Sequence, residues 1–180
     1  MDPVTVSTVI ARPREEVFEY LADIANHSEF TDHYLADFHL LREESYGVGA
    51  GVRFRVTAPF NRFPWGDANF TEIDAPQRIV ERGRGGKFNR NLTRGVWELE
   101  PGPGGSTRVS FTFESKPAKL SDRILESLGA RAWIKRQNKV ALQRLRAILE
   151  EGRRRGRRAT IAGGARKPAS AFRYEAPAPR

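Results

Sequence analysis

The most regular hydrophobic pattern in the sequence lies between Ala130 and Glu151. Its apolar residues recur at helical spacing on one face, and its basic residues fall on the opposite face. The apolar positions are Trp133, Ile134, Ala141, Leu145 and Ile148, with Leu142 and Leu149 beside them, and the basic ones are Lys135, Arg136, Lys139 and Arg146. Gly129 separates this run from a shorter one that opens at Leu120, and Gly152 supplies a stop. The pattern predicts a helix of about 22 residues, roughly 33 Å long, which needs a broad apolar partner surface.

The preceding residues predict a sheet as that partner. Residues 4–11 are β-branched and alternate, which is typical of a strand. Pro13, followed by Glu15 and Glu16, marks a helix start, and a second short helix is predicted from 24 to 30. Six further strands are predicted at about 34–44, 51–58, 66–74, 78–84, 91–100 and 106–115. Strands this close in sequence can be joined only as an antiparallel meander.

The predicted strands have one apolar face and one polar face, as expected of a sheet that covers a core. The apolar face consists of Val52, Phe54, Val56, Trp97, Leu99, Val109, Phe111 and Phe113, and Arg53, Arg55 and Arg108 lie on the opposite face. The register of strand 66–74 stays open: Asn69 and Thr71 point inward in one register, and Glu72 in the other. Strand 91–100 carries the same ambiguity, with Val96 as the alternative to Trp97.

The connections between the strands are of two alternating kinds. Residues 46–49, 74–77 and 101–106 are short, polar and rich in turn formers. Residues 59–65 and 85–90 are longer, aromatic and basic. Because alternate connections of a meander lie at opposite ends of the sheet, the aromatic and basic loops are expected to meet at one end.

Composition favours a single domain, since about 100–200 residues per domain is usual and this chain has 180. The net charge of +9 belongs mostly to residues 151–180, which carry nine Lys and Arg against two Glu. We therefore expect a domain at 1–151 and a basic, disordered tail at 152–180. No signal peptide and no apolar stretch of ~18–20 residues is found, which favours a cytoplasmic protein. The absence of cysteine excludes disulfides, thiolate metal sites and thiol catalysis.

Two groups of polar residues are candidates for chemistry. The first contains His27, Glu29, Asp32, His33 and His39. Its spacing matches no zinc signature, so we expect capping or solvent-exposed roles and no metal, with a histidine at a cavity mouth as the alternative. The second, Gln137 and Asn138, lies beside the apolar stripe and either orients a ligand or bonds to the sheet or a buried water. No nucleophile elbow, Walker motif or Rossmann motif is present, so no cofactor is predicted and catalytic residues stay unassigned.

The order of strand, two helices, six-stranded meander and long helix resembles the SRPBCC superfamily, also called START-like or helix-grip. Residues 6–21 resemble the opening of its polyketide cyclase/dehydrase and lipid-transport branch, and residues 97–109 resemble the penultimate hairpin. The resemblance covers about residues 3–150, although the usual Trp after the second short helix is missing and Phe30 or Tyr34 stands in its neighbourhood. It implies an α+β fold (β-α-α-β6-α) in which a curved antiparallel sheet wraps around the C-terminal helix and encloses an apolar cavity.

The resemblance also implies where a ligand would lie. The expected cavity residues are Phe54, Val56, Phe70, Trp97, Phe111, Phe113, Ile134, Gln137, Asn138 and Ala141. The positions of the meander connections indicate that the cavity mouth is the aromatic and basic end of the sheet, with Phe60, Arg62, Phe63, Trp65, Lys87, Phe88 and Arg90. The alternative is that the Phe side chains close this end of the sheet as part of the core.

Three functions are compatible with these features. The first is binding or transport of a small hydrophobic or amphipathic molecule, such as a lipid, isoprenoid or polyketide, without catalysis. The second is a polyketide cyclase or dehydratase that uses the same cavity. The third is a nucleic-acid-associated protein that acts through the tail, whose arginines could also contact acidic lipid by charge. The oligomeric state is not predicted.

Overall fold

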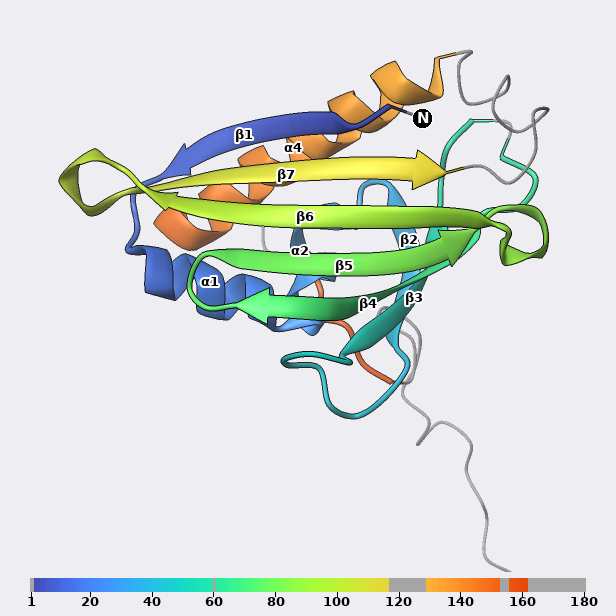
Figure 1. Cartoon of the computed structure of the whole chain (residues 1–180), viewed down its shortest axis with the longest axis horizontal. Coiled ribbons are helices and arrows are strands. Elements are labelled where there is room, and N and C mark those ends of the chain that lie inside the picture. The colour runs from blue at the N-terminus through green and yellow to red at the C-terminus, as the bar shows by residue number, and fades with distance from the viewer. Residues whose placement is uncertain (1, 60, 117–128, 153–155, 162–180) are drawn as a thin grey trace, which may run out of the picture.

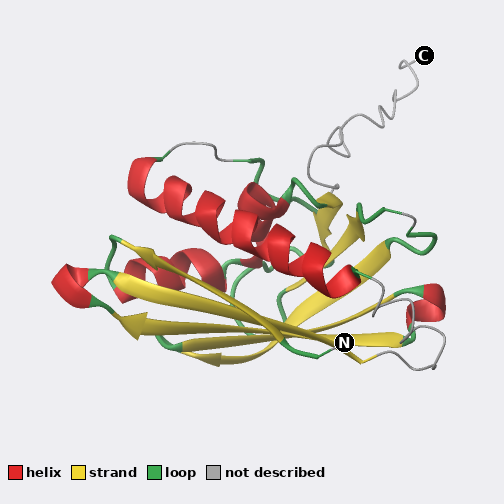
Figure 2. Ribbon diagram, turned by 90° about the horizontal axis from the view of Figure 1, so that it is seen from above, coloured by secondary structure: helices red, strands yellow, loops and turns green. Residues whose placement is uncertain are grey.

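Seven antiparallel strands form one curved sheet, and the helices lie on one of its faces (Figures 1 and 2). The computed structural model describes residues 2–59, 61–116, 129–152 and 156–161. The elements are β1 (Val4–Ile10), α1 (Arg14–Ala22), η1 (Ile24–Asn26), α2 (His27–Thr31), β2 (Leu35–Leu40), β3 (Gly51–Val56), β4 (Trp65–Asp74), β5 (Arg78–Gly85), η2 (Lys87–Asn89), β6 (Asn91–Pro101), η3 (Pro103–Gly105), β7 (Thr107–Lys116) and α4 (Ala130–Glu151). The sheet order is β1-β7-β6-β5-β4-β3-β2, so β2 to β7 form the predicted meander and β1 pairs with β7. This is the predicted α+β helix-grip architecture.

Local sequence features explain where the main helices begin and end. α1 starts directly after Pro13 and carries acidic residues in its first turn, where a helix favours negative charge. α4 begins after Gly129 and ends before Gly152, and both glycines adopt a left-handed backbone, with φ of +99° and +65°. The Gly152 N–H donates to the carbonyls of Ala147 and Ile148, which closes the last turn. The helix start predicted at 120–128 lies outside the described residues.

Two elements near the N-terminus differ from the prediction. The helix expected over 24–30 consists of the 3-10 turn η1, which begins where the Asp23 side chain caps the Ala25 N–H, followed directly by the short helix α2. The strand expected over 34–44 is shorter. β2 ends at Leu40, and its pairing with β3 shifts between Ala36 and His39, where Asp37 has a φ of +52°.

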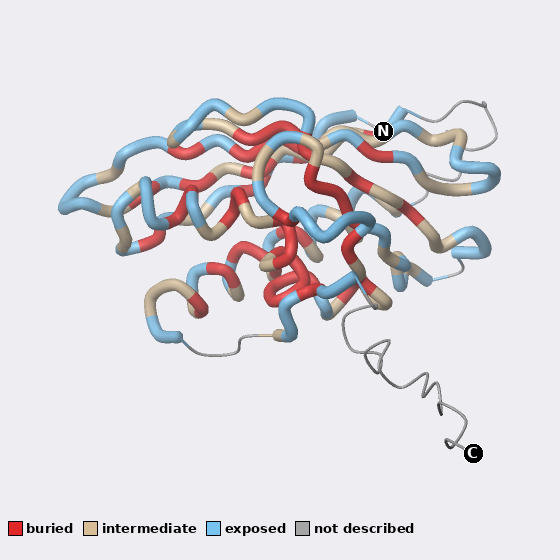
Figure 3. Tube along the Cα trace, turned by 90° about the horizontal axis from the view of Figure 1, so that it is seen from below, coloured by how far each residue is buried: buried red, intermediate tan, exposed pale blue. Residues whose placement is uncertain are grey.

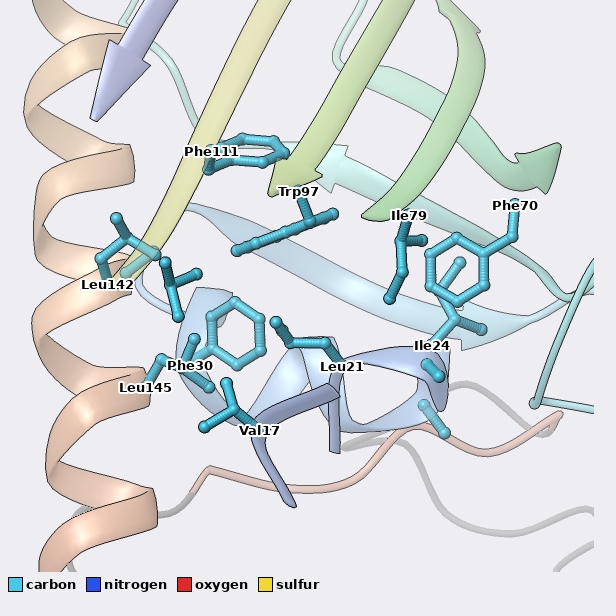
Figure 4. Close-up of a cluster of buried hydrophobic side chains, with 14 of the residues drawn as sticks. Val17, Leu21, Ile24, Phe30, Phe70, Ile79, Trp97, Phe111, Leu142 and Leu145 are labelled. Carbon is cyan, nitrogen blue, oxygen red and sulfur yellow. The ribbon is translucent and has the colours of Figure 1, made fainter. Parts of the chain in front are cut away.

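The core fills the space between the inner face of the sheet and α1, α2 and α4 (Figure 4). The predicted inward positions Trp97, Leu99 and Val109 are buried, and the arginines predicted on the opposite face are exposed. Figure 3 shows this alternation of buried and exposed positions along the strands. From α4, Leu142 and Leu145 enter the core, so Leu142 is central and not at the flank of the stripe.

Residues 156–161, which we call the C-terminal strap, return to the domain after α4. The Gly156 and Ala159 N–H groups donate to the carbonyls of Glu29 and Ala25, and the Thr160 carbonyl accepts from the Leu40 N–H. Ala159 is 1% exposed and belongs to the core. The strap therefore packs against η1, α2 and β2, and the division of the chain into a domain at 1–151 and a tail at 152–180 stays a prediction.

Among the described residues, no helix combines the length and apolar character that are needed to cross a membrane.

Candidate functional site

The interior between the sheet and α4 is closely covered at one end and partly open at the other. Along β3, Val52 is buried and Phe54 is partly exposed. Along β7, Phe111 is buried and Phe113 is partly exposed. The same gradient holds on α4, where Ala141 and Asn138 are buried while Ile134 and Gln137 are partly exposed. The partly exposed ends of these elements all lie toward the connections 57–64 and 86–90 and the start of α4 (Figure 1).

The predicted cavity residues fall on this inner surface in two groups. Trp97 and Phe111 pack together in the covered half, with ring centres 4.2 Å apart (Figure 4). Phe70 lies against the His27 ring, with ring centres 5.5 Å apart. Phe54, Val56, Phe113, Ile134 and Gln137 lie in the partly open half. Asn138 and Ala141 stand between the two groups on α4.

Four polar groups meet inside, from β5, β6, α4 and the turn after α2, and we call Tyr34, Glu81, Trp97 and Asn138 the interior polar cluster. The Tyr34 hydroxyl donates to Asn138 Oδ1 at 3.1 Å, which links the end of α2 to α4. Glu81 lies on the inner face of β5, opposite Gly95 of β6. A Cβ atom on Gly95 would come within 2.2 Å of Glu81 Oε1, so the glycine makes room for the carboxyl to lie over β6.

Two donors of this cluster are buried without a partner. Trp97 Nε1 and Asn138 Nδ2 make no hydrogen bond of normal geometry with any described residue. Trp97 is 3% exposed and Asn138 is 2% exposed, so bulk water does not compensate them. An unsatisfied buried donor costs about 1–3 kcal/mol, and most buried donors in proteins have a partner. The Glu81 carboxyl lies beside the Trp97 indole without completing a hydrogen bond of normal geometry, and Asn138 Nδ2 has no partner, so both donors are suited to an acceptor atom that comes from outside the chain.

The interior also changes the titration of the cluster. Burial raises the pKa of Glu81 to about 7, and the neighbouring Trp97 indole acts in the opposite direction. Burial also raises the pKa of Tyr34, and the Glu81 charge adds to this effect. Glu81 can therefore exchange a proton near neutral pH, whereas Tyr34 stays protonated and acts as a hydrogen-bond donor.

The histidines and acids of the α2 region serve the packing of the fold. His27 is buried, its Nε2 lies 2.8 Å from the Leu21 carbonyl, and burial lowers its pKa to about 4. Asp32 and His33 both contact the Arg144 side chain and so hold α2 against α4. Buried Glu29 accepts from the Tyr20 hydroxyl, and His39 lies against the Trp65 ring. The described residues contain no group of three or more His, Cys, Asp or Glu that could hold a metal ion.

The residues predicted at the cavity mouth come together only in part. Lys87 Nζ lies over the rings of Phe63 and Phe88, so the two aromatic loops do meet at one end of the sheet. Arg62 is exposed and Arg90 is partly exposed at the same end, and Phe60 lies outside the described residues. Trp65 lies on the outer face of the sheet, where it pairs with Arg55 across the strands and stacks under Arg53 at 5.4 Å.

Sequence reasoning missed Glu81 and misplaced the polar residues of β4. Asn69 lies on the outer face with Asp67, and a bulge between Phe70 and Glu72 leaves both Thr71 and Glu72 exposed. Neither register considered for β4 is therefore correct beyond Phe70. The signal for Glu81 was present, because it follows the buried Ile79 by two positions in a strand.

A shallow hollow of about 620 Å³ lies on the outer face of the sheet, away from the interior polar cluster. Arg82, Arg84, Arg94 and Lys116 line it together with Asp67, Asn69, Thr71, Gly83, Leu92, Thr93 and Glu114. Its lining contains more basic than acidic residues and mostly polar side chains, so it differs in character from the apolar interior.

Comparisons with known proteins place the fold among solved structures of low sequence identity. A Helicobacter pylori hypothetical protein, jhp0584, has a TM-score of 0.65 at 12% identity, over 82% of this chain and 88% of that chain. TTHA0849 from Thermus thermophilus has a TM-score of 0.63 at 15% identity, over 84% and 99%. DynU16, a putative protein in the dynemicin biosynthetic locus, has a TM-score of 0.57 at 19% identity, over 84% and 48%.

No curated protein matches this sequence. The family model described as polyketide cyclase/dehydrase and lipid transport matches residues 1–150, which include every described strand and nearly all of α4. The chain therefore belongs to the polyketide cyclase/dehydrase and lipid transport family.

Proposed function

We propose that the domain binds a small hydrophobic or amphipathic molecule, such as a lipid, isoprenoid or polyketide, between the sheet and α4. The observation that carries the proposal is the pair of buried, unpartnered donors, Trp97 Nε1 and Asn138 Nδ2. A ligand carbonyl, hydroxyl or ether oxygen would accept from them, while its apolar part would lie against Phe54, Phe113 and Ile134.

Protonated Glu81 fits the same role. With a pKa near 7, its carboxyl is neutral in a substantial fraction of molecules at neutral pH and can donate to the same acceptor. A ligand that makes these bonds would satisfy groups that are otherwise buried without partners. Membership of a family described by both cyclases and lipid transport is compatible with such a ligand.

Prodan, a neutral naphthyl ketone whose emission moves to the blue in apolar surroundings, is a suitable probe. We expect it to bind the parent protein, and Trp97→Phe to weaken binding about tenfold, since one hydrogen bond contributes about 1.4 kcal/mol. Trp65→Phe is the matched control, because Trp65 lies on the outer face. Equal affinity of the Trp97 and Trp65 variants would contradict the assigned role of the indole.

The entrance for the ligand lies, in this proposal, between the loops that carry Phe63 and Phe88. The partly exposed interior positions and both loops are at the same end of the sheet. Replacing Phe63 and Phe88 with Ser, and separately Arg62 and Lys87 with Glu, is expected to weaken uptake of a fluorescent fatty acid. Far-ultraviolet circular dichroism serves as the folding control. Parent-like uptake by both double variants would place the entrance elsewhere.

A second candidate function is catalysis by a cyclase or dehydratase, and Glu81 is the observation that favours it. A partly buried carboxyl with a pKa of about 7 is well suited to general acid–base catalysis, because it gains and loses a proton near working pH. An enzyme of this kind would convert a linear polyketone, and Glu81→Gln would abolish turnover while prodan binding persists. Absence of turnover in the parent protein would contradict the catalytic function and favour ligand binding or transport.

A further inference from the structure

One end of the outer surface combines exposed apolar side chains with basic ones. Phe88 is 84% exposed, Leu92 is 52% exposed and Phe63 is 47% exposed. Lys87 Nζ lies 5.2 Å from the Phe88 ring centre and 5.8 Å from that of Phe63, so the two loops form one surface. Leu92 faces Arg84 on one neighbouring strand and Lys116 on the other. We call Phe63, Arg84, Lys87, Phe88, Leu92 and Lys116 the basic tip.

Phe88 combines an exposed side chain with an unfavourable backbone conformation. Its φ is +59° and that of Asn89 is +53°, in the left-handed region that residues other than glycine seldom adopt. Such a conformation costs on the order of 1 kcal/mol or more for a bulky residue and is typical of functional positions. The Phe88 ring offsets little of this cost inside the protein, because it is almost fully exposed and outside the core. The exposed Phe88 ring is therefore placed to contact another molecule at the protein surface.

The hollow on the outer face extends the positive charge away from the tip. Arg84, Leu92 and Lys116 belong to both the tip and the hollow, and Arg82 and Arg94 continue the row across β5 and β6. The acidic neighbours neutralise this charge only weakly. Arg82 and Lys116 reach Glu72 and Glu114 at 4.0 Å, and the side chains of Arg84 and Arg94 form no ion pair with the described residues. The row can therefore attract anionic groups from outside.

We propose that the basic tip docks on the surface of an anionic membrane. Phe63, Phe88 and Leu92 enter the boundary between headgroups and acyl chains, and the surrounding cations contact lipid phosphates. A lipid surface fits better than single-stranded nucleic acid. Lys87 lies over both aromatic rings, where a stacking base would bind, and the aliphatic Leu92 offers no stacking surface. This docking is independent of the interior ligand, although it would bring the proposed entrance to a source of apolar molecules.

Vesicle co-sedimentation of the full chain tests the proposal. We expect binding to vesicles of phosphatidylcholine mixed with phosphatidylglycerol, little binding to phosphatidylcholine alone, and weaker binding as salt rises. Phe88→Ser with Leu92→Ser, and separately Arg84→Glu with Lys87→Glu, are each expected to lower the affinity for the anionic vesicles at least about tenfold.

Two controls separate the tip from general effects. Val48→Ser removes an exposed apolar residue from a turn at the other end of the sheet, and Arg108→Glu reverses a charge near that same end. Both are expected to bind vesicles like the parent, and circular dichroism checks the folding of every variant. Vesicle binding like that of the parent in both tip variants would overturn the proposal. Any vesicle binding would then be due to another basic segment of the chain. Binding of a single-stranded RNA oligonucleotide but not of anionic vesicles would also overturn it. Prodan binding, measured on the same variants in the absence of lipid, reports the interior site separately.

Discussion

Glu81 is a carboxyl that the fold partly removes from water, and this has a measurable effect on stability. The unfolded carboxyl ionises near pH 4.5 and the folded one near pH 7. Between these values the folded protein retains a proton that the unfolded chain has lost, so the contribution of Glu81 to stability falls as pH rises. Above pH 7 the accumulated cost is up to roughly 3 kcal/mol.

Glu81→Gln is therefore expected to gain stability relative to the parent between pH 5 and pH 8. Urea denaturation at both pH values measures the free energy of unfolding. Buried His27 acts in the opposite sense. Its pKa is lowered to about 4, so its contribution falls as pH drops from 6.5 to 4, and it cancels in the difference between parent and variant. A difference that is constant with pH would mean that Glu81 is solvated in the fold.

Substitution of the single residue Trp97 tests whether the covered half of the interior is a packed core. Its indole packs against Phe111, His27 and Phe30 and is 3% exposed. Trp97→Ala is expected to cost ~3–5 kcal/mol of unfolding free energy, because the change leaves a large void. A loss below about 1 kcal/mol, which is usual for surface changes, would show that the indole is not part of the core.

At the scale of elements, the C-terminal strap is a segment after α4 that packs against the domain. Truncation after Gly152 removes three backbone hydrogen bonds to Ala25, Glu29 and Leu40 and uncovers the Ala159 site. We expect a loss of roughly 1–3 kcal/mol, measured as a lower midpoint of thermal unfolding. Truncation after Ile161 keeps the strap and is the matched control, with a midpoint expected near that of the parent. Equal midpoints for the two truncations would mean that the strap does not stabilise the domain.

The elements themselves were largely predictable, and the exceptions have physical reasons. The helical spacing of apolar residues predicted α4, and the alternation of apolar and polar residues predicted the strands, because each pattern indicates which face of an element is buried. The strap was not predictable, since its contacts are made by the backbone, by the small residue Ala159 and by Arg158, whose ion pair with Asp23 cannot be told from the other arginines of a basic segment. The bulge in β4 was also missed. The extra residue at Thr71 exchanges the inward and outward positions of the rest of the strand, and no residue type in β4 signals it.

At the scale of the whole molecule, the sequence predicted the fold and the end of the sheet where the aromatic loops meet. It did not predict the interior polar cluster. Asn138 was a candidate from its place on the apolar stripe, but Glu81, Tyr34 and Asn138 come from distant parts of the chain and meet only in the fold. A carboxylate in a strand also suggests a solvated position, because charges are rarely buried without a partner.

The central claim is that the interior polar cluster receives the polar end of an apolar ligand, and the indole N–H signals of the three tryptophans test it most directly. In a proton–nitrogen correlation spectrum, prodan is expected to shift the Trp97 Nε1–H signal strongly as this donor gains an acceptor. Trp65, on the outer face, should not move. Assignment follows from the Trp97→Phe and Trp65→Phe variants. A bound probe that leaves the Trp97 signal unchanged would contradict the claim.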